Sequence, residues 1–136
     1  LVVEDDPIVA DVLGTTLREG GYFKTTADNI ESSLFELKHN QIDAVSLDVN
    51  LPDGDGTRLA RLISKNHMPV PISVVSGNSG IDDKITALGA GADGYLTKPF
   101  VCYELVVNLD AIIRRTHGQS SATVNVGNLM LDLGRN

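Results

Sequence analysis

The side chains in this sequence that could do chemistry follow directly after short apolar runs. They are the acidic group Glu4-Asp5-Asp6, the carboxylate of Asp48, the hydroxyl of Ser76 and the ammonium group of Lys98. Carboxylates gathered in one place repel one another and need a cation, and ligands that are all oxygen suit Mg²⁺. We expect Asp5, Asp48 and a backbone carbonyl to bind Mg²⁺ directly and Glu4 to act through a water, while Asp6 caps a helix.

The same residues describe a site for a phosphoryl group. Lys98 can hold an anionic group beside the metal ion, and the Ser76 hydroxyl can donate a hydrogen bond to the same oxygens. Transfer of a phosphoryl group to a carboxylate needs mainly positioning and electrostatic stabilisation from the protein. We therefore predict that Asp48 is the nucleophile.

Five apolar runs of the β type would position these side chains. Helical segments separate the runs, which predicts an α/β fold with a doubly wound, five-stranded parallel sheet in the strand order 2-1-3-4-5. In this order the first, third, fourth and fifth strands are neighbours, so their carboxyl ends converge on one shallow pocket. The expected strands are Leu1–Val3, Tyr22–Thr25, Ala44–Leu47, Ile72–Val75 and Tyr95–Thr97.

The segments between the runs carry helical signals. Asp6 before Pro7 has the form of an N-cap followed by proline at the first helical position, and this helix should end at Gly20-Gly21. Three further segments have apolar residues spaced for one stripe that packs on the sheet. These stripes are Ile30, Leu34 and Leu37, then Ile81, Ile85 and Leu88, and then Leu105, Leu109, Ile112 and Ile113.

Composition restricts the class of protein. The net charge of −7 should repel nucleic acid from the surface of this chain. Cys102 is the only cysteine, which excludes an internal disulfide and a cysteine-based zinc cluster. No apolar stretch is long enough for a membrane span, and we expect a soluble cytoplasmic protein. The histidines, His39, His67 and His117, show no ligand spacing.

The character of the sequence changes near its end. We expect a globular domain over residues 1–116, a polar linker over 117–123 and the first β-hairpin of a truncated second domain over 124–136. The opening on Leu1-Val2-Val3 reads as the middle of a strand, so a few residues should precede it.

Four motifs together resemble the receiver domains of two-component response regulators, which have a flavodoxin-like (CheY-like) fold. They are Val3-Glu4-Asp5-Asp6-Pro7, Leu47-Asp48-Val49-Asn50-Leu51-Pro52-Asp53-Gly54-Asp55-Gly56, Val75-Ser76-Gly77, and the run from Gly91 to Phe100. The resemblance implies a signalling phosphoacceptor and not an enzyme, with Asp48 phosphorylated by a histidine kinase or a phosphotransfer protein. It also implies that Glu4, Asp5 and the Asn50 carbonyl organise Mg²⁺, and that Lys98 contacts the acyl phosphate.

The resemblance further implies a cis peptide bond before Pro99 and a switch. In that switch Ser76 moves toward the phosphoryl oxygens and Tyr95 turns inward. Asn50 and Asn78 would influence the lifetime of the phosphorylated state.

Residues 91–115 and the tail are similar to the OmpR/PhoB class, whose output is a winged-helix DNA-binding domain. This implies a transcription regulator that binds DNA only through the missing C-terminal domain, with no membrane partner. The class forms homodimers through the fourth helix, fifth strand and fifth helix. Lys84 and Glu104 match one of its ion pairs, whereas Gly94 and Asn108 stand where a second pair has Asp and Arg.

Other functions remain open on the sequence. A haloacid-dehalogenase-like phosphatase also uses an Asp nucleophile and Mg²⁺, but it needs an acid two residues further on, where this chain has Asn50. A flavodoxin-like FMN carrier conflicts with Glu4-Asp5-Asp6, which would repel the phosphate of FMN. A receiver-like interaction domain that works without phosphorylation is the third alternative, and the complete set of site residues argues against it.

Overall fold

A parallel sheet forms the centre of the computed structural model, which describes residues 1–77 and 80–117. Its strand order is β2-β1-β3-β6-β7, and every neighbouring pair is parallel. This is the predicted order 2-1-3-4-5, with two short strands outside the sheet also numbered. The five strands are β1 (Val2–Val3), β2 (Thr26–Ala27), β3 (Val45–Asp48), β6 (Ile72–Ser76) and β7 (Gly94–Thr97).

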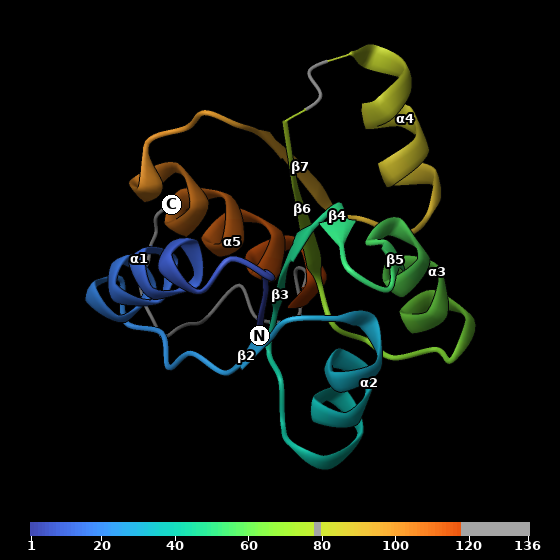
Figure 1. Cartoon of the computed structure of the whole chain (residues 1–136), viewed down its shortest axis with the longest axis horizontal. Coiled ribbons are helices and arrows are strands. Elements are labelled where there is room, and N and C mark those ends of the chain that lie inside the picture. Colours follow the sequence, from blue (N-terminus) through green and yellow to red (C-terminus); the bar gives the residue numbers. More distant parts are fainter. Residues whose placement is uncertain (78–79, 118–136) are drawn as a thin grey trace.

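Helices cover both faces of this sheet, as Figure 1 shows. On one side lie α1 (Pro7–Glu19) and α5 (Cys102–His117), and on the other lie α2 (Ile30–His39), α3 (Thr57–Lys65) and α4 (Ile81–Gly89). The predicted linker of residues 117–123 begins inside α5, because His117 is the last residue of that helix. The rest of the linker, the predicted hairpin, Asn78 and Ser79 lie outside the described residues. Within the described part of the chain, no helix combines the length and apolar character needed to cross a membrane.

Alternation along the strands divides the core into two clusters, because successive side chains of a strand point to opposite faces. Val3, Leu47 and Val74 pack with α2, α3 and α4, whereas Val2 and Val75 pack with α1 and α5. The stripe predicted for α5 is confirmed, since Leu105, Leu109 and Ile112 are buried in the second cluster and Ile113 packs against it. The stripe of α2 is confirmed as well, with Ile30 buried and Leu34 and Leu37 packed against the first cluster.

The predicted position of the second strand was wrong. The strand occupies Thr26–Ala27, not Tyr22–Thr25. The Tyr22 amide donates to the Leu17 carbonyl at 2.9 Å, which makes Tyr22 part of the turn that ends α1. Phe23, whose apolar side chain suggested a strand, is 98% exposed.

The packing predicted for α4 was also wrong. Ile81 is 73% exposed, Ile85 60% and Leu88 41%, so this stripe faces away from the sheet. The helix packs through the small residues Ala87 and Ala90, which are buried in the first cluster. Small side chains let the backbone of α4 approach the sheet, and the helical spacing then directs the larger side chains outward.

A small hairpin after β3 was not predicted. Strands β4 (Asn50–Leu51) and β5 (Gly54–Asp55) pair antiparallel, and Leu51 is buried in the first cluster. The hairpin leads into α3, where Asp55 Oδ1 accepts hydrogen bonds from the amide and the hydroxyl of Thr57, each at 2.8 Å.

Close approach to β3 requires a glycine at position 56. The Gly56 amide donates to the Val49 carbonyl at 2.6 Å. A Cβ atom at this position would lie 2.2 Å from the Asp48 carbonyl oxygen, which is backbone and cannot turn aside. The loop that follows Asp48 can therefore fold back on the strand only because residue 56 has no side chain.

Gly56→Ala should consequently destabilise the chain. We expect the free energy of unfolding in urea to fall by about 1–3 kcal/mol, the usual cost of overpacking. Gly89→Ala is the matched control, because a Cβ atom there meets nothing within 4 Å. Equal stabilities of the two variants, measured by circular dichroism, would contradict this steric explanation.

The pH dependence of stability should reveal the contact between the hairpin and α2. The Asp53 carboxylate accepts hydrogen bonds from the Ile30 amide at 2.9 and 3.0 Å, and this contact is the largest cause that lowers the pKa of Asp53 below its ordinary 3.8. A carboxyl with a depressed folded pKa stabilises the fold above its unfolded pKa and loses this effect as the pH falls through the folded value. In urea unfolding, the free energy of unfolding of the wild type should therefore exceed that of Asp53→Asn by a constant amount above about pH 5. This difference should shrink as the pH falls below the unfolded pKa. A difference that does not change with pH would refute this origin.

Candidate functional site

The carboxyl ends of four parallel strands bring the predicted site residues together. Glu4 follows β1, Asp48 and Ser76 are the last residues of β3 and β6, and Lys98 follows β7. The register pairs Asp48 with Val75 and Ser76 with Thr97. The Lys98 amide also donates to the Ser76 carbonyl at 2.7 Å, which ties the end of β7 to the end of β6.

Three carboxylates form an acidic cluster at this edge. One oxygen atom from each of Glu4, Asp5 and Asp48 lies within 4.8 Å of the others. Glu4 is 6% exposed and Asp48 5%, whereas Asp5 is exposed to solvent. Two of the three charges are thus shielded from water, and the third is open to it.

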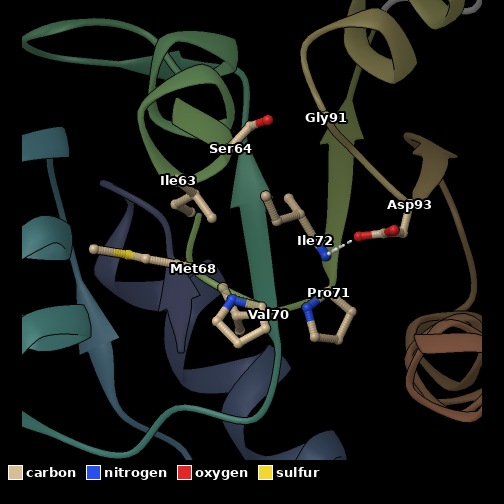
Figure 2. Close-up of a pocket in the computed structure, with 9 residues that line it drawn as sticks. Ile63, Ser64, Met68, Val70, Pro71, Ile72, Gly91 and Asp93 are labelled. Carbon is tan, nitrogen blue, oxygen red and sulfur yellow. Dashed lines mark hydrogen bonds between the residues drawn. The ribbon is translucent and has the colours of Figure 1, made fainter. Parts of the chain in front are cut away.

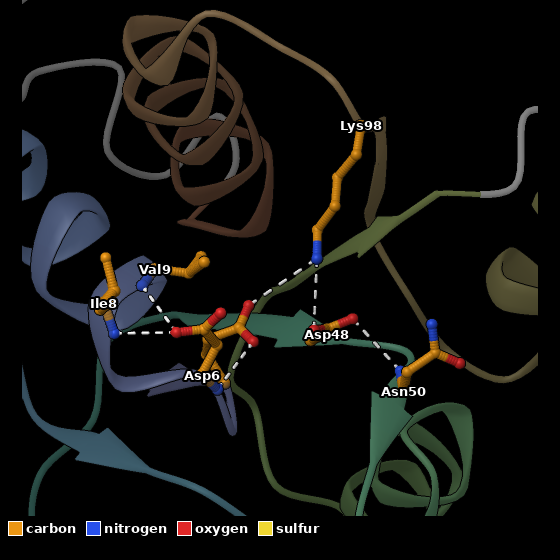
Figure 3. Close-up of polar contacts among 7 residues, drawn as sticks. Asp6, Ile8, Val9, Asp48, Asn50 and Lys98 are labelled. Atoms are coloured by element: carbon orange, nitrogen blue, oxygen red, sulfur yellow. Dashed lines mark hydrogen bonds and ion pairs between the residues drawn. The ribbon is translucent and has the colours of Figure 1, made fainter.

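Lys98 faces this cluster. Its Nζ atom lies 3.3 Å from Asp48 Oδ2 and 3.8 Å from Glu4 Oε1. Figure 3 shows the lysine side chain extending from its loop toward Asp48. The Lys98-Pro99 peptide bond is cis, as predicted.

The charges of the cluster favour an additional cation. Burial is the largest cause that raises the pKa of Glu4 to about 7, and the nearby charge of Asp48 raises it further. Among the described residues, Lys98 is the only cation that pairs with these carboxylates, so three carboxyl groups face one ammonium. All-oxygen ligands with an excess of negative charge fit a hard divalent ion such as Mg²⁺.

Asp6 does not join the cluster. Its Oδ1 atom accepts hydrogen bonds from the amides of Ile8 at 2.9 Å and Val9 at 3.4 Å, contacts that Figure 3 displays. The residue is the N-cap of α1, with Pro7 in the first turn, as the sequence indicated. Its amide donates to Glu4 Oε2 at 3.2 Å and so helps to orient that carboxylate.

The other predicted site residues lie at or near the same edge. The Asn50 amide donates to Asp48 Oδ1 at 3.2 Å, which places its backbone beside the carboxylate. Ser76 is buried at the end of β6, and Tyr95 on β7 is half-buried against the first core cluster. Metal binding by the Asn50 carbonyl and movement of Ser76 and Tyr95 stay predictions.

The residues predicted for a dimer face have different environments. Lys84 and Glu104 are exposed, and Glu104 Oε1 accepts a hydrogen bond from the Val101 amide at 2.8 Å. Asn108 is turned toward the sheet, where its Oδ1 atom accepts a hydrogen bond from the buried hydroxyl of Ser73 at 2.5 Å. A Cβ atom at Gly94 would lie only 2.8 Å from this oxygen, so the glycine provides the space for the amide.

Asp53 and Asp55 were quoted in a motif but received no role from the sequence. Asp55 accepts hydrogen bonds from Thr57, the first residue of the helix that follows, and its position two residues before Thr57 could have indicated this contact. Asp53 instead contacts the start of α2, more than twenty residues away. No local pattern indicates such a long-range contact.

A hollow near α3 is separate from the acidic cluster. It has a volume of about 210 Å³ and lies at the amino ends of β6 and β7, at the opposite edge of the sheet. Figure 2 shows its lining, including the hydrogen bond of 2.8 Å from the Ile72 amide to Asp93. None of the predicted site residues lines it.

Comparison with known proteins agrees with this geometry. Residues 1–110 match the family described as response regulator receiver domain. The chain is 35% identical over 133 residues to the cell cycle response regulator CtrA of Brucella ovis, a match that covers 98% of this chain and 57% of the relative. This chain thus spans little more than half the length of that relative.

Solved structures are similar as well. The receiver domain of the Francisella response regulator 1452 is 31% identical, with a TM-score of 0.80 over 85% of this chain and 95% of that one. The beryllofluoride-activated NtrC4 receiver domain dimer is 27% identical, with a TM-score of 0.78 over 85% of this chain and 95% of that one. The strand order, the acidic cluster opposite Lys98 and these matches lead to one conclusion: the chain belongs to the response regulator receiver domain family.

Proposed function

We propose that this chain is a phosphoacceptor that is modified on Asp48 in a Mg²⁺-dependent reaction. The observation that carries the proposal is the position of the Asp48 carboxylate, which lies 3.3 Å from the Lys98 ammonium and within 4.8 Å of carboxylate oxygens of Glu4 and Asp5. An oxygen of Asp48 attacks the phosphorus atom, the bond from phosphorus to the donor breaks, and the donor leaves with the electron pair. Asp48 then carries an acyl phosphate.

The chain's own residues have distinct tasks in this reaction. Lys98 neutralises charge on the incoming phosphoryl oxygens, and the Asn50 amide orients the nucleophile through Asp48 Oδ1. Glu4, Asp5, Asp48 and the Asn50 carbonyl would hold Mg²⁺, whose charge offsets that of the carboxylates and the phosphoryl group.

The donor would be a histidine kinase or a phosphotransfer protein, which agrees with membership of the response regulator family. The chain is then a signalling protein and assists only its own phosphorylation and dephosphorylation. The new dianion would draw Ser76 toward it and let Tyr95 turn inward, which changes the surface near α4. An interaction domain that works without phosphorylation would have no need for a buried carboxylate opposite Lys98, and this observation favours the phosphoacceptor.

A cytoplasmic transcription regulator is the proposed whole protein. The relative CtrA is named a cell cycle response regulator, and the 133 residues matched correspond to 57% of its length. Under this proposal a winged-helix domain that follows the receiver domain binds DNA. The receiver domain itself would bind DNA poorly, because the net charge of this chain is −7.

Phosphorylation is tested by incubation with acetyl phosphate, with and without Mg²⁺, followed by intact mass. The wild type should gain one phosphoryl group only when Mg²⁺ is present, and Asp48→Asn should gain none. Asp43→Asn is a matched control, because Asp43 is an exposed carboxylate near the opposite end of the same strand. No gain in the wild type under any condition would contradict the proposal and favour the phosphorylation-independent interaction domain.

Phosphorylation should also promote a homodimer through α4, β7 and α5. The apolar residues Ile81, Ile85 and Leu88 are exposed on α4, next to Lys84. The similar NtrC4 receiver domain is a dimer in its beryllofluoride-activated form. An exposed ion pair of Lys84 with Glu104 would contribute only about 0–1 kcal/mol, so the apolar residues should provide most of the affinity.

Sedimentation velocity with beryllofluoride and Mg²⁺ tests this dimer. We expect the wild type to shift from monomer to dimer and Ile85→Asp to stay a monomer, because a charge there would have to be desolvated. Val12→Asp, on the exposed side of α1, should dimerise like the wild type. A wild type that stays monomeric at high concentration would refute the dimer.

A further inference from the structure

Asp53 connects the loop beside Asp48 to a distant helix. Its carboxylate accepts hydrogen bonds from the Ile30 amide at 2.9 and 3.0 Å and from the Glu31 amide at 3.3 Å. These are the first amides of α2, and they lie 22 and 23 residues before Asp53 in the chain. Beside them, Ile30 Cδ1 lies 3.4 Å from where a Cβ atom of Gly54 would be, so the turn of the hairpin sits directly on the start of α2.

The opposite end of the same hairpin contacts the nucleophile. The Asn50 amide donates to Asp48 Oδ1, and Asn50 pairs with Asp55 across the hairpin. The other polar contacts of the loop lie at its base and not at its tip: the Gly56 amide donates to Val49, the Thr57 amide to Asp55, and the Val49 amide to the Val75 carbonyl of β6 at 3.2 Å. Among the described polar contacts, those of Asp53 are therefore the ones that fix the tip of the hairpin to a separate element.

The helix itself has a second cap. Asn29 Oδ1 accepts a hydrogen bond from the Ser32 amide at 2.8 Å, and the hydrogen bonds of Asn29 within the described part of the chain go to neighbouring residues and not to the hairpin. The start of α2 thus offers two acceptors that can be removed separately. We expect that removal of the Asn29 acceptor loosens only the start of α2. Removal of the Asp53 acceptor should loosen both the start of α2 and the hairpin.

We propose that Asp53 is a positioning residue for the Asp48 site: by holding the first amides of α2, it fixes the β4–β5 hairpin and thereby the Asn50 backbone beside Asp48. This inference rests on the proposed function, in which the Asn50 carbonyl binds Mg²⁺. Coupling between two sites is reciprocal. Mg²⁺ at the acidic cluster must then also strengthen the contact of Asp53 with Ile30 and Glu31.

Mg²⁺ titration followed by amide chemical shifts tests whether Asp53 strengthens the binding of Mg²⁺. We expect Asp53→Ala to raise the dissociation constant of Mg²⁺ about fivefold, near the lower end of couplings between linked sites. Asn29→Ala is the matched control and should leave the constant unchanged, although it removes an acceptor from the same helix end. Asp53→Asn keeps one acceptor oxygen and should give an intermediate value, so it replaces the alanine variant if that one does not fold.

Hydrogen exchange tests, without any phosphorylation, whether Mg²⁺ strengthens the contact of Asp53 with the start of α2. In the wild type, saturation with Mg²⁺ should slow exchange of the Ile30 and Glu31 amides. This slowing should disappear in Asp53→Ala and be reduced in Asp53→Asn. Equal Mg²⁺ affinities of Asp53→Ala and wild type, or equal losses in Asp53→Ala and Asn29→Ala, would overturn the inference. These outcomes leave the proposed function standing, whereas a folded wild type that binds no Mg²⁺ and gains no phosphoryl group removes both.

Discussion

Burial of the Glu4 and Asp48 carboxylates beside the Lys98 ammonium group is the constraint on which the rest of this structure depends. Charges removed from water are costly unless partners compensate for them. The parallel sheet supplies those partners, since it places the end of β7, and with it Lys98, near the ends of β1 and β3. The compensation is incomplete, as the raised pKa of Glu4 indicates, and an acidic cluster of this kind has a strong reason to bind a cation.

The loop from Val49 to Gly56 connects this charged edge of the sheet to helices α2 and α3. Within a few residues it contacts the nucleophile through Asn50, the core through Leu51, α2 through Asp53 and α3 through Asp55. Gly56 lets the loop return close to the strand it left. A loop held at so many points is poorly suited to wide movement. Small shifts at Asp48 would reach α2 and α3 as changes in the hydrogen bonds that begin those helices.

The sequence predicted the site better than it predicted the elements around it. Polar residues after buried strands must meet at one edge of a parallel sheet, so Glu4, Asp48 and Lys98 could be placed together from topology alone. The second strand was misplaced because Tyr22 and Phe23 look like strand residues, although Tyr22 closes the end of α1. Helical spacing identified one apolar side of α4, but spacing cannot say whether that side faces the sheet, and Ala87 packs there instead. The partner of Asp53 depends on the tertiary fold.

The two departures from the OmpR/PhoB pattern, Gly94 and Asn108, have a common physical cause. The hydroxyl of Ser73 is fully buried and needs a partner, and Asn108 accepts its hydrogen bond in the space that Gly94 leaves open. A side chain at position 94 would collide with that amide, so an internal hydrogen bond and an ion pair on the surface exclude each other at these positions. Lys84 and Glu104 remain exposed on the neighbouring helices, and Lys84 lies beside the exposed isoleucines of α4. A partner that relies on an Asp at position 94 and an Arg at position 108 would find neither on this chain.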